Sequence, residues 1–134
     1  MRAGEIRVAI NSDQDIVAAR QRGRALATEL GFSTGDATLI ATAISELARN
    51  IVSYARKGEI TLKIVHASSG QGVLIMASDS GPGIRDIRQA MRDGFSTSGS
   101  LGLGLPGVRR LMDEFEITSE PGRGTMVTVK KWKQ

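Results

Sequence analysis

The sequence predicts an α+β fold, a two-layer sandwich in which helices cover one face of a mixed, mostly antiparallel sheet. Two pairs of strand-like runs are each joined by a short glycine-containing turn, which is the pattern of antiparallel hairpins. Two helical segments follow one another without an intervening strand, so helices collect in blocks. The 134 residues are enough for one core and too few for two comfortable ones. We therefore expect residues 1–134 to form a single domain.

The first strand and the first helix are predicted near the N-terminus. Residues 5–10 (EIRVAI) alternate apolar and polar side chains in the manner of a strand. Ser12 or Asp13 can cap a helix that continues to about Leu30, where Gly31 is a natural stop. Its inward-facing stripe at helical spacing comprises Ile16, Ala19, Gly23, Leu26 and Leu30.

A second helix also has an apolar stripe at helical spacing. Thr34 or Asp36 can cap it, and we expect it to run to about Lys57, with Gly58 as its stop. The stripe comprises Ile40, Ala43, Ile44, Leu47 and Ile51. This helix can therefore bury one face against the core.

The rest of the chain predicts two hairpins on either side of a glycine-rich stretch. The strand-like runs occupy 59–67, 72–79, 116–120 and 125–132. A short helix is expected at about 84–91, and the residues after it are too rich in glycine to be regular. Pro106 can lie in the first turn of a final helix over residues 106–115 (PGVRRLMDEF), because its missing N–H is not needed there.

Glu46 and Asn50 lie beside the apolar stripe of the second helix. They are four residues apart, so they project from one face of the helix at about one turn's separation. The two side chains lie at the boundary between the buried face of the helix and the contents of the adjacent cleft. A carboxylate and a carboxamide in this position can hold a metal ion and its water, although such residues on a helix flank are more often solvated surface.

Three glycine-containing segments are typical of contacts with a nucleotide. In 79–83 (DSGPG) the glycines allow a flat ligand close to the backbone, and the aspartate can accept a hydrogen bond from an exocyclic amine such as adenine N6. The segment 99–105 (GSLGLGL) leads directly into a helix, and its backbone N–H groups together with the helix N-terminus favour phosphate binding. The third segment, 122–125 (GRGT), also suits a hairpin turn. Each segment alone is explained by a turn or connector, but their alignment along one chain indicates a nucleotide.

Composition argues against several other classes of protein. The absence of cysteine removes disulfides, thiolate metal sites and cysteine nucleophiles, and the one histidine, His66, is expected to be an exposed strand end. No apolar run approaches the roughly 18 residues of a transmembrane helix, and the N-terminus lacks the apolar region of a signal peptide. We therefore expect a cytoplasmic protein without a membrane partner.

The formal net charge of +4 comes from dispersed arginines and a basic end, KKWK. No basic stripe interleaved with aromatic residues occurs, so we expect no nucleic-acid partner. A mildly basic surface suits ATP or an acidic protein equally well. The phosphate-binding GxxxxGK[ST] loop, the HRD, DFG and VAIK elements of common protein kinases, and a dinucleotide-binding GxGxxG after the first strand are all absent.

Four short motifs, taken in order, resemble the N, G1, G2 and G3 boxes of the GHKL ATPase superfamily, that of gyrase B, Hsp90, histidine kinases and MutL. They are ExxxN (Glu46, Asn50), DxGxG (Asp79, Gly81, Gly83), GLGL (Gly102 to Leu105) and GxGT (Gly122 to Thr125). Longer phrases, among them TAISELARNI and DGFSTSGSLGLGLPGV, resemble the RsbT family of stressosome serine/threonine-protein kinases. This likeness spans about residues 5–132.

The resemblance implies an ATP- and Mg²⁺-dependent kinase with a role for each motif. Glu46 would be the general base for the acceptor hydroxyl, Asn50 would coordinate Mg²⁺, and Asp79 would read adenine. Thr125 would support the adenine end, and the stretch 94–105 would form a lid over the phosphates. The residues implied to contact ATP are Asn50, Asp79, Gly81, Gly83, Ile84, Gly94, Thr97, Ser98, Gly99, Leu101, Gly102, Leu103, Gly104, Leu105 and Thr125.

The resemblance also implies protein partners. STAS-domain scaffold proteins of the RsbS and RsbR types would accept the phosphoryl group, and the released kinase would activate an RsbU-like PP2C phosphatase or another downstream effector. Two alternatives stay open: an anti-sigma-factor kinase of the SpoIIAB or RsbW type, and a non-catalytic, nucleotide-gated binding module. Arg49 can neutralise phosphate or touch the partner protein, and its helical angle alone does not decide between these roles.

Overall fold

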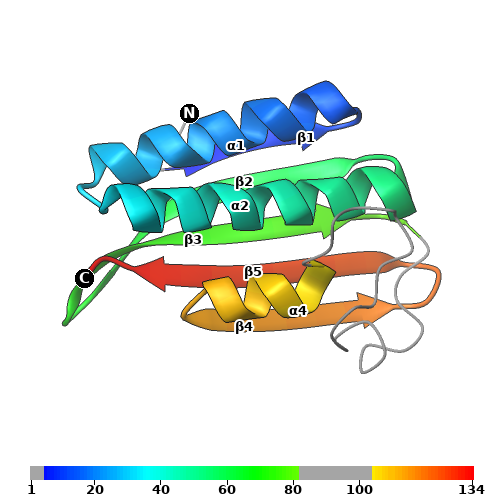
Figure 1. Cartoon of the computed structure of the whole chain (residues 1–134). Helices are drawn as coiled ribbons and strands as arrows, with labels where there is room; N and C mark the ends of the chain where they lie inside the picture. The colour runs from blue at the N-terminus through cyan, green and yellow to red at the C-terminus, as the bar shows by residue number, and fades with distance from the viewer. Residues whose placement is uncertain (1–4, 82–103) are drawn as a thin grey trace.

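The computed structural model describes residues 5–81 and 104–134, which form a two-layer α+β sandwich (Figure 1). The elements in chain order are β1 (Glu5–Ile10), α1 (Asp13–Glu29), α2 (Thr34–Asn50), the π-helical turn η1 (Ile51–Ala55), β2 (Gly58–Ala67), β3 (Gly70–Asp79), α4 (Gly104–Leu111), β4 (Glu114–Glu120) and β5 (Gly124–Trp132). The helices α1, α2 and α4 cover one face of the sheet. This arrangement of helices and strands confirms the predicted fold class. None of these helices is long and apolar enough to cross a membrane.

The sheet has five strands in the order β1-β2-β3-β5-β4. We expected a mixed, mostly antiparallel sheet, and all four ladders between the described strands are antiparallel. Both predicted hairpins, β2–β3 and β4–β5, are present. The register places Asp79, the last residue of β3, opposite Gly58 of β2 and Thr125 of β5. Three strands therefore meet around Asp79 at one end of the sheet.

The core lies between α2 and the central strands. All five residues of the predicted α2 stripe are buried, and they pack with buried strand residues that include Ile60, Leu62, Ile75 and Val129. Each such aliphatic side chain contributes about 1.5–3 kcal/mol through removal from water. In α1 the stripe is buried except for Leu30, which is only partly buried because it follows the last helical residue, and Ala27 is buried in addition.

Both predicted helix caps differ in detail from the structure. Ser12 occupies the position before α1, but its side chain caps nothing; instead the Asp15 carboxylate accepts the Asn11 N–H at 2.8 Å. The cap of α2 is Ser33, whose hydroxyl oxygen accepts the Asp36 N–H at 3.1 Å, because Thr34 is already helical. The capping residue therefore lies one position before the predicted Thr34.

The predicted end of the second helix was wrong. Regular α-helix ends at Asn50, the chain continues through the π-helical turn η1, and Arg56 takes the left-handed φ of 71°. Gly58 is the first residue of β2 instead of the helix stop. A side chain at Gly58 would collide with the Ser78 carbonyl oxygen, so a close strand contact requires this glycine.

The last helix begins and ends earlier than we expected. α4 starts at Gly104, two residues before Pro106, and ends at Leu111, and Glu114 and Phe115, which we expected in this helix, are the first residues of β4. Pro106 remains in the first turn, where its missing N–H has no helical partner to lose. The short helix expected at 84–91 lies outside the described residues. His66 is exposed near the end of β2, as expected.

Candidate functional site

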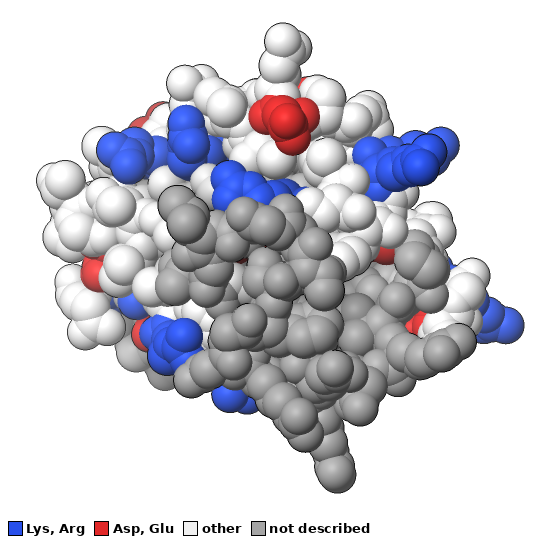
Figure 2. Space-filling view, turned by 45° about the vertical axis from the view of Figure 1, so that its right-hand side comes forward, with Lys and Arg blue, Asp and Glu red and all other residues white. Residues whose placement is uncertain are grey.

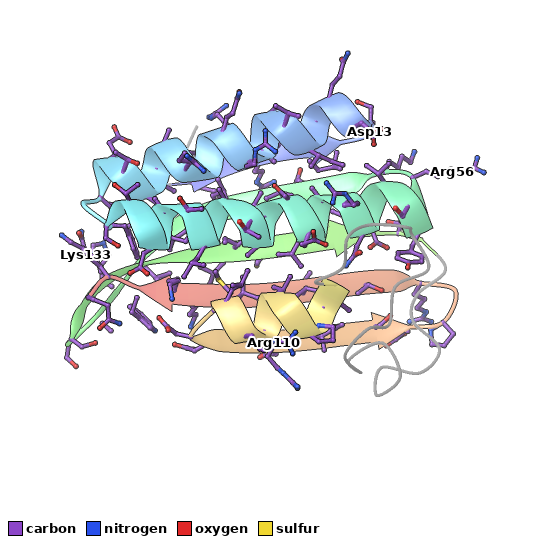
Figure 3. The ribbon with its side chains drawn as sticks, viewed as in Figure 1. Asp13, Arg56, Arg110 and Lys133 are labelled. Carbon is purple, nitrogen blue, oxygen red and sulfur yellow. The ribbon has the colours of Figure 1, made fainter. Side chains whose placement is uncertain are left out.

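The predicted site residues that the structure describes gather at one end of the molecule. This end comprises the last turns of α2, the turn η1, the end of β3 and the starts of β2 and β5, and η1 contacts both β2 and β3. It lies on the right of Figure 1, and Figure 3 places Arg56 there, opposite the end that carries Lys133. Figure 2 brings this side forward, and among the residues that it colours around the grey area Lys and Arg are more prominent than Asp and Glu. Such a surface suits an anionic ligand.

Glu46 is a buried carboxylate whose two oxygens have different surroundings. Only 8% of the residue is exposed. Oε1 accepts a hydrogen bond from Arg49 Nη1 at 3.4 Å, whereas Oε2 is buried and has no hydrogen-bond partner within the described part of the chain. A buried polar atom without a partner costs about 1–3 kcal/mol. No described residue therefore competes with a ligand or a reacting group for Oε2.

Asn50 occupies the junction between α2 and η1. It is partly buried, and its side chain makes no capping hydrogen bond to the π-helical turn. Turns of this kind inside helices are frequent at functional sites. One turn separates Asn50 from Glu46 along the same face of the helix, as the sequence predicts. Its amide oxygen is of the chemical type that binds Mg²⁺.

Asp79 closes β3 and begins a tight turn. Its Oδ1 accepts the Gly81 N–H at 2.9 Å, so the carboxylate is held by the backbone that follows it. Both residues are partly buried. The position agrees with the expected carboxylate at a strand end.

Three glycines pack the backbone closely around Asp79. A Cβ at Gly81 would lie 2.5 Å from Ala55 Cβ, and one at Gly124, where φ is 116°, would collide with the Asp79 carbonyl oxygen. Gly58 is crowded in the same way by β3. Gly81 lies against η1, and its expected contact with a nucleotide stays a prediction. The backbone that carries Asp79 is therefore fixed on three sides.

Thr125 belongs to a pair of hydroxyl groups. Its Oγ1 lies 2.8 Å from Ser119 Oγ, and Ser119 also donates a hydrogen bond to the Gly124 carbonyl oxygen at 3.1 Å. Ser119 is not among the residues predicted from the sequence. The sequence feature that could have identified it is a polar residue at an inward position of β4. It lies two residues after the partly buried Ile117 and shortly before the GRGT turn.

The remaining predicted contacts fall in or after the glycine-rich stretch. Gly104 and Leu105 form the start of α4, and Leu105 is part of the core with 7% of its surface exposed. The other assigned positions lie outside the described residues and stay predictions; they are Gly83, Ile84, Gly94, Thr97, Ser98, Gly99, Leu101, Gly102 and Leu103. The structure thus brings Glu46, Asn50, Asp79 and Thr125 to one end of the fold.

Similar sequences are found along nearly the whole chain. Residues 35–134 match the family of histidine kinase-, DNA gyrase B-, and HSP90-like ATPases. Serine/threonine-protein kinase RsbT of Bacillus subtilis is 58% identical over 125 residues, which cover 93% of this chain and 94% of that protein. An anti-sigma F factor of a Thermoanaerobacter species is 32% identical over 127 residues, covering 92% of this chain and 89% of that protein.

A solved structure has the same fold. It is the crystal structure of the RsbU and RsbW domains of a Mycobacterium tuberculosis protein, with a TM-score of 0.67 and 21% sequence identity. The likeness covers 96% of this chain and 32% of that longer chain. At this level of identity it is evidence for the fold alone.

Proposed function

The chain belongs to the histidine kinase-, DNA gyrase B- and HSP90-like ATPase family, within which it is an RsbT-like serine/threonine-protein kinase, and we propose that it phosphorylates STAS-domain scaffold proteins of a stressosome. The reaction converts ATP and a protein serine or threonine into ADP and a phosphoprotein. The acceptors would be proteins of the RsbS and RsbR types in the cytoplasm. Once released from them, the kinase would bind and activate an RsbU-like phosphatase or another effector.

The observation that carries this proposal concerns the buried Oε2 of Glu46. A general base must offer a lone pair within reach of the proton that it removes, and this oxygen has no other hydrogen-bond partner among residues 5–81 and 104–134. In the proposed reaction Oε2 accepts the proton of the acceptor hydroxyl, whose oxygen then attacks the γ-phosphorus as the bond to ADP breaks. The hydrogen bond from Arg49 to Oε1 limits rotation of the carboxylate.

The described residues also fit ATP with Mg²⁺. Asn50 offers an amide oxygen as a ligand, and Mg²⁺ in such sites is commonly held by few protein groups together with substrate phosphates. The bound ion would neutralise charge on the transferring phosphate. Asp79, held by Gly81, would accept a hydrogen bond from the adenine amine, and Thr125 lies on the adjacent strand.

Phosphoryl transfer to a purified STAS-domain protein tests the proposal. Wild type, Glu46→Gln and Asn50→Ala would be compared with Mg²⁺ and ATP labelled at the γ-phosphate. We expect Glu46→Gln to retain nucleotide binding and lose transfer by a factor on the order of 10²–10⁴, the usual contribution of a general base. Asn50→Ala should abolish transfer because the metal ion loses its protein ligand.

Binding to the same partner separates the alternatives. Retained partner binding by wild type without any transfer would overturn the kinase proposal in favour of a nucleotide-gated binding module. The 32% identity with an anti-sigma F factor supports a second candidate, direct capture of a sigma factor. Capture of a sigma factor but not of a STAS-domain protein in parallel pull-downs would favour that candidate.

A further inference from the structure

The turn between η1 and β2 holds an arginine in a backbone conformation that suits glycine. Arg56 has a φ of 71° and a ψ of −33°, and among the described residues it is the one position other than glycine with a positive φ. A residue with a Cβ is strained in this region, and strain of this kind clusters at functional sites, where the surrounding structure maintains it. An arginine at this position therefore indicates a role for its side chain that the turn itself does not require.

Packing around the turn maintains the conformation of Arg56. On one side Ala55 lies so close to Gly81 that a Cβ on the glycine would be 2.5 Å from Ala55 Cβ. On the other side the buried Ile51 lies against Gly58, where an added Cβ would be 2.9 Å from Ile51 Cγ2. The direction of the Arg56 side chain is therefore fixed by its neighbours. Figure 3 shows Arg56 at the outer corner of this end of the molecule, with its side chain directed away from the ribbon.

Arg56 and Lys57 place two positive charges side by side at this corner. Both residues are exposed. Neither side chain forms an ion pair or a hydrogen bond within residues 5–81 and 104–134. The next residue, Gly58, pairs with Asp79, so the corner borders the candidate site. Two exposed cations without a carboxylate partner in the described chain favour an anionic partner that approaches from solvent.

We propose that Arg56 and Lys57 form a docking point for an acidic surface of the protein that accepts the phosphoryl group. This inference rests on the proposed function, because it concerns the acceptor of the same reaction. A protein fits the observations better than the nucleotide does. Arg56 is directed away from the fold, whereas the candidate nucleotide contacts Asn50 and Asp79 are partly buried. Charges at the rim of an interface accelerate the encounter with a surface of opposite charge and orient it.

Binding kinetics of the full chain with a purified STAS-domain acceptor test the inference, with equilibrium binding of ATP measured in parallel. We expect Arg56→Gln to lower the association rate constant for the acceptor by a factor of about 3–10 at low salt, and adding Lys57→Gln to lower it further. The dissociation constant for ATP should stay the same. Lys133→Gln is the matched control, because it removes one exposed charge at the opposite end of the molecule (Figure 3) and should leave both constants unchanged.

Arg56→Gly separates the role of the charge from the role of the turn. Glycine relieves the strain, so the midpoint of thermal unfolding should rise by about 2–5 °C while association slows as it does in Arg56→Gln. An unchanged association rate in the Arg56→Gln and Lys57→Gln double variant, an equal decrease in Lys133→Gln, or weaker binding of ATP alone would overturn the inference. A lower midpoint in Arg56→Gly would also overturn it, because the arginine would then serve the fold. If wild type neither bound nor phosphorylated the STAS-domain protein, the proposed function itself would fail, and the inference with it.

Discussion

Two regions at the same end of the molecule are built in opposite ways. The base end consists of Asp79, Thr125 and the glycines packed around them, and it is held by backbone contacts and by hydrogen bonds. The transfer end consists of Glu46, Arg49 and Asn50, where a carboxylate oxygen is buried without a partner in the described residues. Recognition of a rigid base requires fixed geometry, whereas proton transfer requires an atom that is free to react. The residues that hold the base end in place are thus different from the residues of the transfer end that would react.

Gly124→Ala should have the largest effect and break the base end. The new Cβ collides with the Asp79 carbonyl oxygen and adopts an unfavourable φ of 116°, so β5 has to move away from β3. We expect a loss of about 3 kcal/mol or more in the free energy of unfolding, measured by denaturant titration. The control is Gly122→Ala, which has a φ of 82° but no atom within 4 Å of its Cβ, and should lose only about 1 kcal/mol. Equal losses would show that backbone strain, and not the strand contact, dominates.

Gly81→Ala should affect the base end less strongly. Its Cβ would lie 2.5 Å from Ala55 Cβ and 2.8 Å from Ala55 Cα, and the end of the described segment can shift to relieve part of this overlap. We expect a loss of about 1–2 kcal/mol in the free energy of unfolding. Adding Ala55→Gly should recover part of the loss, and a double-mutant cycle measures this coupling. Strict additivity of the two changes would contradict the proposed contact.

Arg49→Gln should change the transfer end without changing stability much. Loss of the 3.4 Å contact to Oε1 leaves the Glu46 carboxylate free to rotate, so we expect kcat for transfer to fall by a factor on the order of ten. The KM for ATP should stay the same, and Arg49→Lys should restore part of the rate. Arg109→Gln, an exposed arginine of α4, is the matched control. A change confined to the KM for the acceptor protein would assign Arg49 to partner binding instead.

Glu46→Gln should have the smallest effect on folding although it has a large effect on transfer. The glutamine fills the same space and removes a buried charge, while the contribution of the partly exposed Arg49 pair is small. We expect the free energy of unfolding to change by less than about 1 kcal/mol in denaturant titrations. A loss as large as that of Gly124→Ala would mean that the transfer end is also a structural element.

The sequence pattern was sufficient for most of the fold. Apolar spacing identified α1, α2 and their buried stripes, and alternating runs with glycine turns identified both hairpins. These features follow from local periodicity, which is written directly in the residues. The end of α2 could not be read in the same way, because the π-helical turn after Asn50 and the left-handed Arg56 depend on how η1 packs against β2 and β3.

The candidate site was also predictable only in part from the sequence. The sequence by itself determined that Glu46 and Asn50 share a helix face, that Asp79 ends a strand, and that glycines follow it in the next turn, since spacing and turn chemistry specify these relations. Only the tertiary structure decided which atoms are engaged: the Arg49 guanidinium contacts Oε1, Oε2 has no hydrogen-bond partner among the described residues, and Ser119 and Thr125 form a hydroxyl pair. Strand register and burial bring these groups together from separate segments, and a one-dimensional pattern contains neither distance nor solvent exposure.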